Sequence, residues 1–298
     1  MKQWMLMIAV AMLCNTAILN AGEITYKVLC STGDVQIQNE PSQPFAAAKV
    51  NNVISKNATV RIGAKGGYCC VLGSDGHTQE FMKPGAVKLS ATDGKPVSGT
   101  MQTIVGFLET SMKNPTGKRY VGSVYRSVGR SSIVFPYDTR VLDDTIELVW
   151  HAEQGERKYQ LQMKDDKNSV LLKRTVADTS IKLNLTTVPT LQRGSCVYWN
   201  ASTQTNPSTS SYALCWASKP EADSLRDEFT KFKNQERGTL DPERSPIAAM
   251  LCGAWYERAG YFAEALKYYN KAYKMQPDAA PFRNAMNTLL ARLGGDGR

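Results

Sequence analysis

Short runs in which apolar and polar residues alternate fill the first two thirds of the chain and predict β-strands. In the N-terminal part these runs cover residues 24–29, 35–38, 58–62, 68–72, 77–82 and 86–89. Asp75-Gly76 stands between two of them, and an Asp-Gly pair in this position predicts a hairpin turn. We therefore expect a small β domain over residues 22–97, with a hairpin tip at Asp75 and Gly76.

A second set of alternating runs predicts seven strands between residues 131 and 218. They cover residues 132–136, 145–151, 158–164, 169–176, 180–185, 195–200 and 212–217. This number and spacing of short strands is typical of an immunoglobulin-like or fibronectin type III-like sandwich. Leu191, Gly194, Tyr198 and Trp199 resemble the start of the sixth strand of such domains. The proline of that motif is absent, so we predict the architecture and no single family.

From residue 219 to residue 298 the apolar spacing becomes that of helices. Residues 221–234 predict a charged helix with one apolar side, and residues 281–293 predict a capping helix. Between them, one window that starts at Pro246 resembles a tetratricopeptide repeat. Its matching positions are Gly253, Tyr256, Gly260, Ala265, Tyr269, Ala272 and Pro277. One repeat cannot bury both of its faces, so we expect it to dock on the 221–234 helix, on the sandwich or on another chain.

The N-terminal β pattern carries a further likeness. Its motifs are, in order, Gly33-Asp34-Val35, Val60-Arg61-Ile62-Gly63, Val71-Leu72, Asp75-Gly76 and Lys83-Pro84-Gly85. This order resembles the FecR-like periplasmic β domain over residues 24–91. Regulators of the ferric-citrate type carry an anti-sigma segment and a transmembrane helix before this domain. Here we expect only a signal peptide before it, so the resemblance implies a periplasmic interaction module and no sigma-factor control.

Together these patterns predict a multi-domain β plus α protein. The N-terminal and middle domains are expected to be mainly β, and the C-terminal repeat α-helical.

Residues 1–21 have the pattern of a cleavable secretory signal peptide. Lys2 precedes an apolar run over residues 4–14, and cleavage is expected after Ala21. The run is shorter than the roughly 20 residues that a spanning helix needs; an uncleaved anchor is the alternative. A lipid anchor on Cys14 is not expected, because Leu13 stands where lipidation requires a small residue. The predicted location is periplasmic or secreted, with no transmembrane segment after cleavage.

The chain has a formal net charge of +9, and its densest basic segment lies between the two predicted β domains. Residues 98–130 begin with a predicted amphipathic helix and continue as a linker without acidic residues. Its basic residues are Lys113, Lys118, Arg119, Arg126 and Arg130. This patch is a candidate site for an anionic glycan or lipid, and a solvated linker is the alternative.

Export makes disulfides the expected state of paired cysteines. Cys196 and Cys215 flank a polar loop, and pairing them centres the turn between Thr205 and Asn206. The two cysteines then lie opposite each other in an antiparallel hairpin. We therefore predict the disulfide Cys196–Cys215.

A second disulfide is predicted from Cys30 to either Cys69 or Cys70, because all three belong to the same exported β domain. Cys69 and Cys70 are neighbours in one strand and face opposite sides of the sheet. Cys252 is either a buried apolar residue or the partner of whichever of these two is left. The sequence leaves both pairings open.

Catalytic and cofactor motifs are absent from the sequence, including G-x-S-x-G, H-E-x-x-H, the P-loop and G-x-G-x-x-G. Cys69, Cys70 and His77 lack the spacing of zinc ligands, and adjacent strand residues do not share one ion. The lysines and tyrosines after Lys267 belong to an ordinary repeat helix rather than a nucleic-acid interface. We therefore expect no catalytic residues, no metal, no cofactor and no nucleic-acid partner.

The resulting hypothesis is an exported, non-enzymatic binding or scaffolding protein of the bacterial cell envelope. Its contacts with an envelope protein partner are expected through the repeat helices, at Trp255, Tyr256, Tyr261 and Phe262. The alternative from another class is an envelope glycan- or peptidoglycan-binding module that uses the basic linker and exposed aromatic residues. A third alternative is a hydrolase without a familiar motif.

Overall fold

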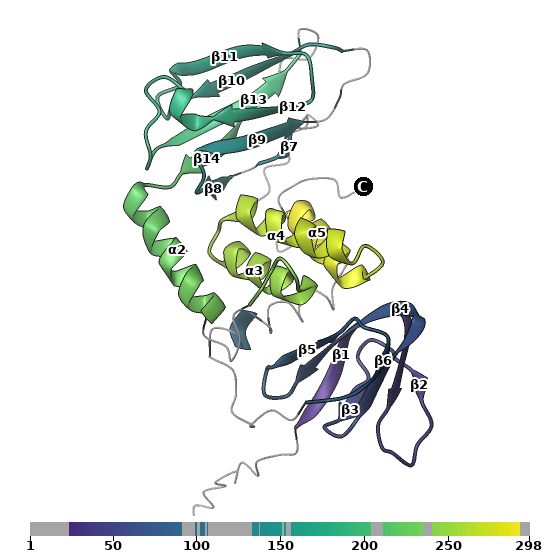
Figure 1. Ribbon diagram of the computed structural model, residues 1–298. Coiled ribbons are helices and arrows are strands. Elements are labelled where there is room, and N and C mark those ends of the chain that lie inside the picture. The colour runs from purple at the N-terminus through teal and green to yellow at the C-terminus, as the bar shows by residue number, and fades with distance from the viewer. Residues whose placement is uncertain are drawn as a thin grey trace, which may run out of the picture.

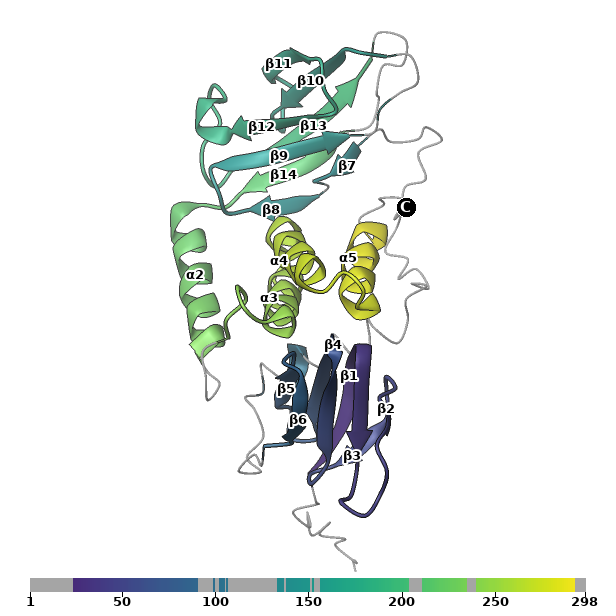
Figure 2. The ribbon, with the colours of Figure 1, turned by 45° about the vertical axis from the view of Figure 1, so that its right-hand side comes forward.

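The computed structural model describes residues 24–90, 99, 102–104, 106, 133–136, 138–150, 152, 156–203, 211–234 and 240–292. These residues form three parts arranged in a row, with a helical region between two β parts (Figures 1 and 2). The described chain is thus mainly β, with a helical C-terminal region. The predicted signal peptide and the basic residues of the predicted linker lie outside the described residues.

Two long antiparallel strands, β1 and β4, build the N-terminal β part. Its strands are β1 (Thr25–Gln38), β2 (Ala46–Ala47), β3 (Val53–Ser55), β4 (Thr59–Gly73), β5 (Thr78–Phe81) and β6 (Gly85–Lys88). The N-terminal end of β1 pairs with β3 and its C-terminal end pairs with β2. Likewise, the N-terminal end of β4 pairs with β6 and its C-terminal end pairs with β5. The predicted hairpin tip is present, since the Gly73 backbone N–H donates to the His77 carbonyl at 2.7 Å across Asp75 and Gly76.

The change of neighbours within β1 and β4 depends on glycines. The register between the two strands shifts after Gly33, which has a φ of 74°. A Cβ at Gly33 would lie 2.8 Å from the Gly66 carbonyl oxygen, and one at Gly67 would lie 2.9 Å from the Thr32 carbonyl oxygen. Only glycine allows this close crossing of two backbones. Residues on both sides of the shift, including Val28 and Val35 of β1 and Val60 and Val71 of β4, pack into one apolar cluster.

The middle part contains two sheets that enclose a second core. Its strands are β7 (Ile133–Phe135), β8 (Thr139–Val141), β9 (Thr145–Trp150), β10 (Tyr159–Lys164), β11 (Val170–Val176), β12 (Ser180–Asn184), β13 (Cys196–Ser202) and β14 (Tyr212–Trp216). The sheet orders are β11-β10-β13-β14-β8 and β12-β9-β7, and the short 3-10 helix Leu185–Thr187 follows β12. Ile146, Leu148 and Trp150 alternate into the core as their spacing predicts. Strand β8 was not predicted; it pairs in parallel with β14.

The C-terminal region consists of α2 (Lys219–Asn234), α3 (Pro246–Arg258), α4 (Phe262–Met275) and α5 (Ala280–Arg292). Helix α3 begins where Ser245 accepts a hydrogen bond from the Ala248 N–H at 2.9 Å, with Pro246 in the first turn. Helices α3 and α4 pack closely at Gly253, where a Cβ would lie 2.6 Å from the Tyr269 ring. Residues 102–104 and 106 are also helical.

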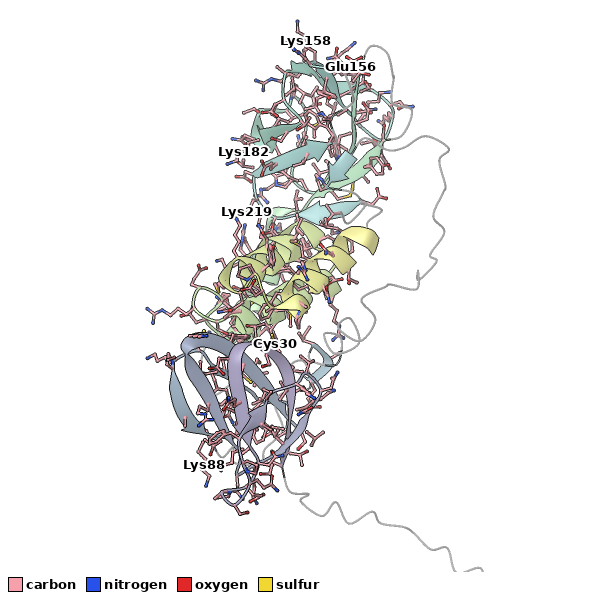
Figure 3. All side chains as sticks on the ribbon, turned by 90° about the vertical axis from the view of Figure 1, so that its right-hand side faces the viewer. Cys30, Lys88, Glu156, Lys158, Lys182 and Lys219 are labelled. Atoms are coloured by element: carbon pink, nitrogen blue, oxygen red, sulfur yellow. A yellow bond between two sulfur atoms is a disulfide. The ribbon has the colours of Figure 1, made fainter. Side chains whose placement is uncertain are left out.

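One apolar cluster joins the helical region to both β parts. It includes Cys30, Tyr68 and Cys70 from the N-terminal part, and Leu142 and Ala217 from the middle part. Figure 3 shows Cys30 at the end of the β part that faces the helices and Lys88 at its far end. The repeat-like helices therefore dock on α2, on the middle part and on the N-terminal part at once.

Candidate functional site

The described residues form a cleft of about 400 Å³ between the middle part and the helices. Helix α4 contacts the short strand β8, and residues of β9 and α5 line the cleft next to this contact. The wall on the β side includes Val141, Thr145, Glu147 and Val149. Thr145, Glu147 and Val149 point outward because they alternate with the core residues of β9.

The helical wall combines aliphatic and polar side chains. Leu266, Met286 and Leu290 are aliphatic, while Lys267 and Asn270 are polar. Interfaces between domains are common places for ligand sites. An apolar cleft with a few polar groups at such an interface is therefore the candidate site of this chain.

A three-residue charge cluster lies in this cleft. The Lys267 Nζ is 2.7 Å from Asp143 Oδ2 and 2.9 Å from Glu264 Oε2. Burial raises the pKa of the Glu264 carboxyl, although the nearby ammonium opposes this shift. Burial also acts to lower the pKa of Lys267, but the two carboxylates outweigh it and raise that pKa. Lys267 is therefore charged and held in place by both neighbours.

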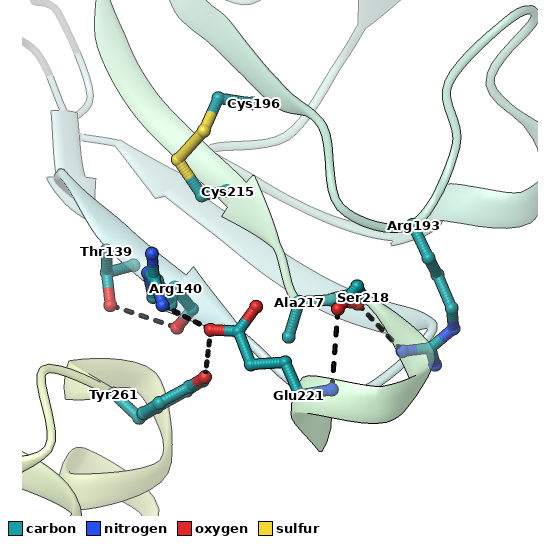
Figure 4. A network of polar contacts seen from close by, with 9 residues as sticks. All are labelled: Thr139, Arg140, Arg193, Cys196, Cys215, Ala217, Ser218, Glu221 and Tyr261. Carbon is teal, nitrogen blue, oxygen red and sulfur yellow. Dashed lines mark hydrogen bonds and ion pairs between the residues drawn. A yellow bond between two sulfur atoms is a disulfide. The ribbon is translucent and has the colours of Figure 1, made fainter. Parts of the chain in front are cut away.

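Polar contacts fix the cleft by joining the middle part to the helices (Figure 4). Glu221 of α2 pairs with Arg140 of β8 and accepts a hydrogen bond from the Tyr261 hydroxyl at 2.7 Å. The Phe262 backbone N–H donates to Thr139 Oγ1 at 3.1 Å. Three elements distant in the sequence thus meet beside the cleft.

A second junction, at the opposite end of the helical region, holds the N-terminal β part. The Glu80 carboxylate accepts hydrogen bonds from the Tyr68 hydroxyl at 2.5 Å, from the Ile247 backbone N–H at 3.2 Å and from the Ser245 hydroxyl. The Tyr68 ring also lies 5.8 Å from the Phe282 ring. A carboxylate at the N-terminus of α3 is favourable because the helix dipole is positive there. Sequence reasoning missed Glu80, since nothing near it in the sequence indicates this distant partner.

The predicted disulfide Cys196–Cys215 is present, with a Cα–Cα distance of 3.9 Å between directly paired residues of β13 and β14. A disulfide is typical of exported proteins. No helix of the described residues is long and apolar enough to cross a membrane.

The predicted disulfide from Cys30 is wrong for this structure, in which Cys30, Cys69, Cys70 and Cys252 are free thiols. Cys69 and Cys70 do face opposite sides, but Cys70 faces the helices and Cys69 the β core. An irregular pairing at Leu29 directs Cys30 to the helical side too. The thiols pack there as small apolar groups. Burial raises the pKa of Cys30, Cys69 and Cys252 to about 12.

The predicted partner-binding aromatic residues do not form an exposed surface. Trp255, Tyr256 and Tyr261 are buried, and Phe262 is half-buried. Phe229 of α2 lies 5.2 Å from the Trp255 ring and 4.5 Å from the Tyr256 ring. These side chains therefore serve contacts within the chain, a result that their repeat positions alone could not indicate.

His77 lies beside the hairpin tip. Its Nδ1 is 3.2 Å from Asp75 Oδ2, and its backbone N–H donates to Asp75 Oδ1 at 3.1 Å. Among the described residues, no group of three or more His, Cys, Asp or Glu side chains could hold a metal ion. The Lys113, Lys118, Arg119, Arg126 and Arg130 patch lies outside the described residues.

Comparison with known proteins assigns no family to the chain. No family model and no curated protein matches it. It is weakly similar to a solved structure, the β-1,2-glucanase from Parabacteroides distasonis, at 11% sequence identity and a TM-score of 0.22. The match covers 85% of this chain and 38% of the glucanase chain. A likeness at this level supports neither a fold assignment nor an activity.

Proposed function

We propose that this chain is an exported, non-enzymatic binding or scaffolding protein of the bacterial cell envelope that acts through protein–protein contacts. The observation that carries the proposal is the cleft between β9 and helices α4 and α5, with walls from two parts of the chain. The Glu221 junction joins these two parts beside the cleft, and the Glu80 junction holds the N-terminal β part on the same helical region. A preformed cleft on a fixed frame suits binding, because little ordering is needed when a partner arrives.

Each likeness in the sequence supports the same role. The FecR-like pattern, the sandwich pattern and the repeat-like pattern are all typical of interaction modules. The disulfide Cys196–Cys215 agrees with an oxidising compartment outside the cytoplasm. In this proposal the envelope partner binds at the cleft, and the three parts give it a fixed orientation.

Site-directed crosslinking in the native envelope tests the proposal. A photoreactive benzoylphenylalanine replaces Thr145, which is exposed on β9 at the cleft. The matched control places it at Thr175, which is exposed on β11 and does not line the cleft. We expect a protein adduct from position 145 and none from position 175. The adduct should be identified by mass spectrometry and should still form when the crosslinking is carried out in high salt.

Two results of these experiments would contradict the scaffolding role or favour an alternative. If neither position gives a protein adduct in the envelope, the scaffolding role is refuted. Retention of the protein on peptidoglycan that falls with added salt, without any protein adduct, would favour the glycan-binding alternative. A broad hydrolase screen addresses the enzyme alternative.

A further inference from the structure

We infer that the cleft between β9 and helices α4 and α5 binds a basic, aliphatic peptide segment of a partner protein. This inference rests on the binding role proposed above and names the chemistry of the partner. Three properties of the cleft lead to it: aliphatic walls, an excess of carboxylates and a polar group suited to a peptide bond.

The aliphatic walls come from both parts of the chain. Val149 lies on the β side, and Leu266, Met286 and Leu290 lie on the helical side. No aromatic side chain of the described residues lines the cleft. A ligand gains affinity here by removing its own aliphatic side chains from water.

Carboxylates outnumber ammonium groups in the cleft. Asp143, Glu147 and Glu264 line it, and Lys267 is the single basic residue of the described lining. Lys267 already pairs with Asp143 and Glu264. The lining is therefore acidic although the whole chain carries a net charge of +9. The negative charge of the lining favours a cationic ligand and disfavours an anionic polysaccharide.

Glu147 is the carboxylate best placed to meet a ligand charge. It is exposed on the outer face of β9 and forms no ion pair with another described residue. Lys182 stands opposite it on β12, so the two side chains share the outer face. A lysine or arginine of the partner would place its charge next to Glu147 while its aliphatic neighbours entered the cleft.

Asn270 gives the third property. Its side chain lines the cleft and is half-buried on α4. A carboxamide both donates and accepts hydrogen bonds, as a peptide group does. The volume of about 400 Å³ accommodates a short segment rather than a folded domain.

Fluorescence anisotropy with labelled peptides tests this inference on the full chain. The probe is three repeats of Lys-Leu-Gly, compared with a Glu-Leu-Gly peptide and a Lys-Ser-Gly peptide of equal length. We expect saturable binding of the Lys-Leu-Gly peptide, and affinities for the other two that are lower by about tenfold or more. The Glu peptide reports the charge requirement, and the Ser peptide reports the aliphatic requirement.

Protein variants locate the binding. Thr145→Trp fills the cleft from an exposed position and should weaken binding by about tenfold or more. Glu147→Gln removes one exposed charge contact and should weaken it by about 2- to 5-fold. The matched controls are Thr175→Trp on β11 and Asp227→Asn on the exposed side of α2, and both should bind as the unchanged chain does. Equal melting temperatures of all variants show that the fold is intact.

The inference is overturned if the Lys-Leu-Gly peptide shows no saturable binding or if Thr145→Trp binds it as well as Thr175→Trp does. It is also overturned if the Glu peptide binds more tightly. A protein adduct at position 145 combined with no peptide binding would refute the peptide chemistry alone and leave the scaffolding role standing. Absence of both would refute both.

Discussion

Replacing Glu80 by alanine tests how the N-terminal β part is fixed to the helices. The carboxylate accepts hydrogen bonds from the Tyr68 hydroxyl, the Ser245 hydroxyl and the Ile247 backbone N–H. Without it, the buried Tyr68 hydroxyl loses its acceptor, which costs about 1–3 kcal/mol. The variant also lacks a favourable charge at the N-terminus of α3, worth about 0.3–1 kcal/mol. We expect the free energy of unfolding to fall by about 1–4 kcal/mol.

Urea unfolding of a double-mutant cycle measures this contact. The cycle combines Glu80→Ala with Tyr68→Phe, which keeps the aromatic ring against Phe282 and removes only the hydroxyl. We expect a coupling energy of about 1–2 kcal/mol, because each single change already breaks the shared hydrogen bond. Glu40→Ala is the matched control: this carboxylate belongs to a turn and makes no hydrogen bond with another described residue. It should change stability by less than about 0.5 kcal/mol.

Glu80 does not fix the N-terminal β part to α3 if the Glu80→Ala variant is as stable as the Glu40→Ala control. A coupling energy near zero would be equally decisive. Either result would mean that the apolar cluster alone fixes the β part to α3.

Four further predictions concern other features. Cys196→Ser/Cys215→Ser should lower the free energy of unfolding by about 3 kcal/mol, measured in urea, because a loop closure is lost. Gly253→Ala should cost about 1–3 kcal/mol from overpacking against a buried tyrosine ring, whereas Gly106→Ala, with open space around it, should not destabilise. A thiol reagent at about pH 8 should label none of the four buried thiols before unfolding and all of them afterwards; fast labelling of the folded protein would contradict their raised pKa values. Burial raises the pKa of Glu264, so the folded state binds the proton of this carboxyl more tightly than the unfolded state does. The contribution of Glu264 to the free energy of unfolding therefore falls as pH rises from 4.5 through the raised pKa. Glu264→Gln should remove this part of the pH dependence of the melting temperature.

Local patterns predicted the strands of the middle part other than β8, and they predicted which side of the sheet the alternating residues of β9 face. Ile146, Leu148 and Trp150 are buried because a period of two assigns them to one face. The same rule separated Cys69 from Cys70. It did not indicate what lies on each face, because that depends on packing between distant segments. The parallel pairing of β8 with β14 is a tertiary feature of the same kind.

The candidate site was the part of the molecule that sequence reasoning missed. The alternating pattern gave Thr145 and Glu147 no feature beyond that of outward-facing strand residues. Lys267 likewise had the pattern of an ordinary polar helix face. They meet only because α4 docks on β8, more than 100 residues earlier in the chain. The predicted partner-binding aromatic residues are not exposed, and their exposure could not be judged from the sequence because it depends on the position of α2.

The position of α2 also decides where a partner can bind at low cost. Binding through Trp255 and Tyr256 would require α2 to leave, which would expose Phe229 and Phe232. Each buried phenylalanine contributes about 1.5–3 kcal/mol, so the displacement would cost several kcal/mol before any new contact formed. The Glu221 contacts at the start of α2 would break as well. The cleft on the other side of α4 is already open, so a partner that binds there displaces no part of the described chain.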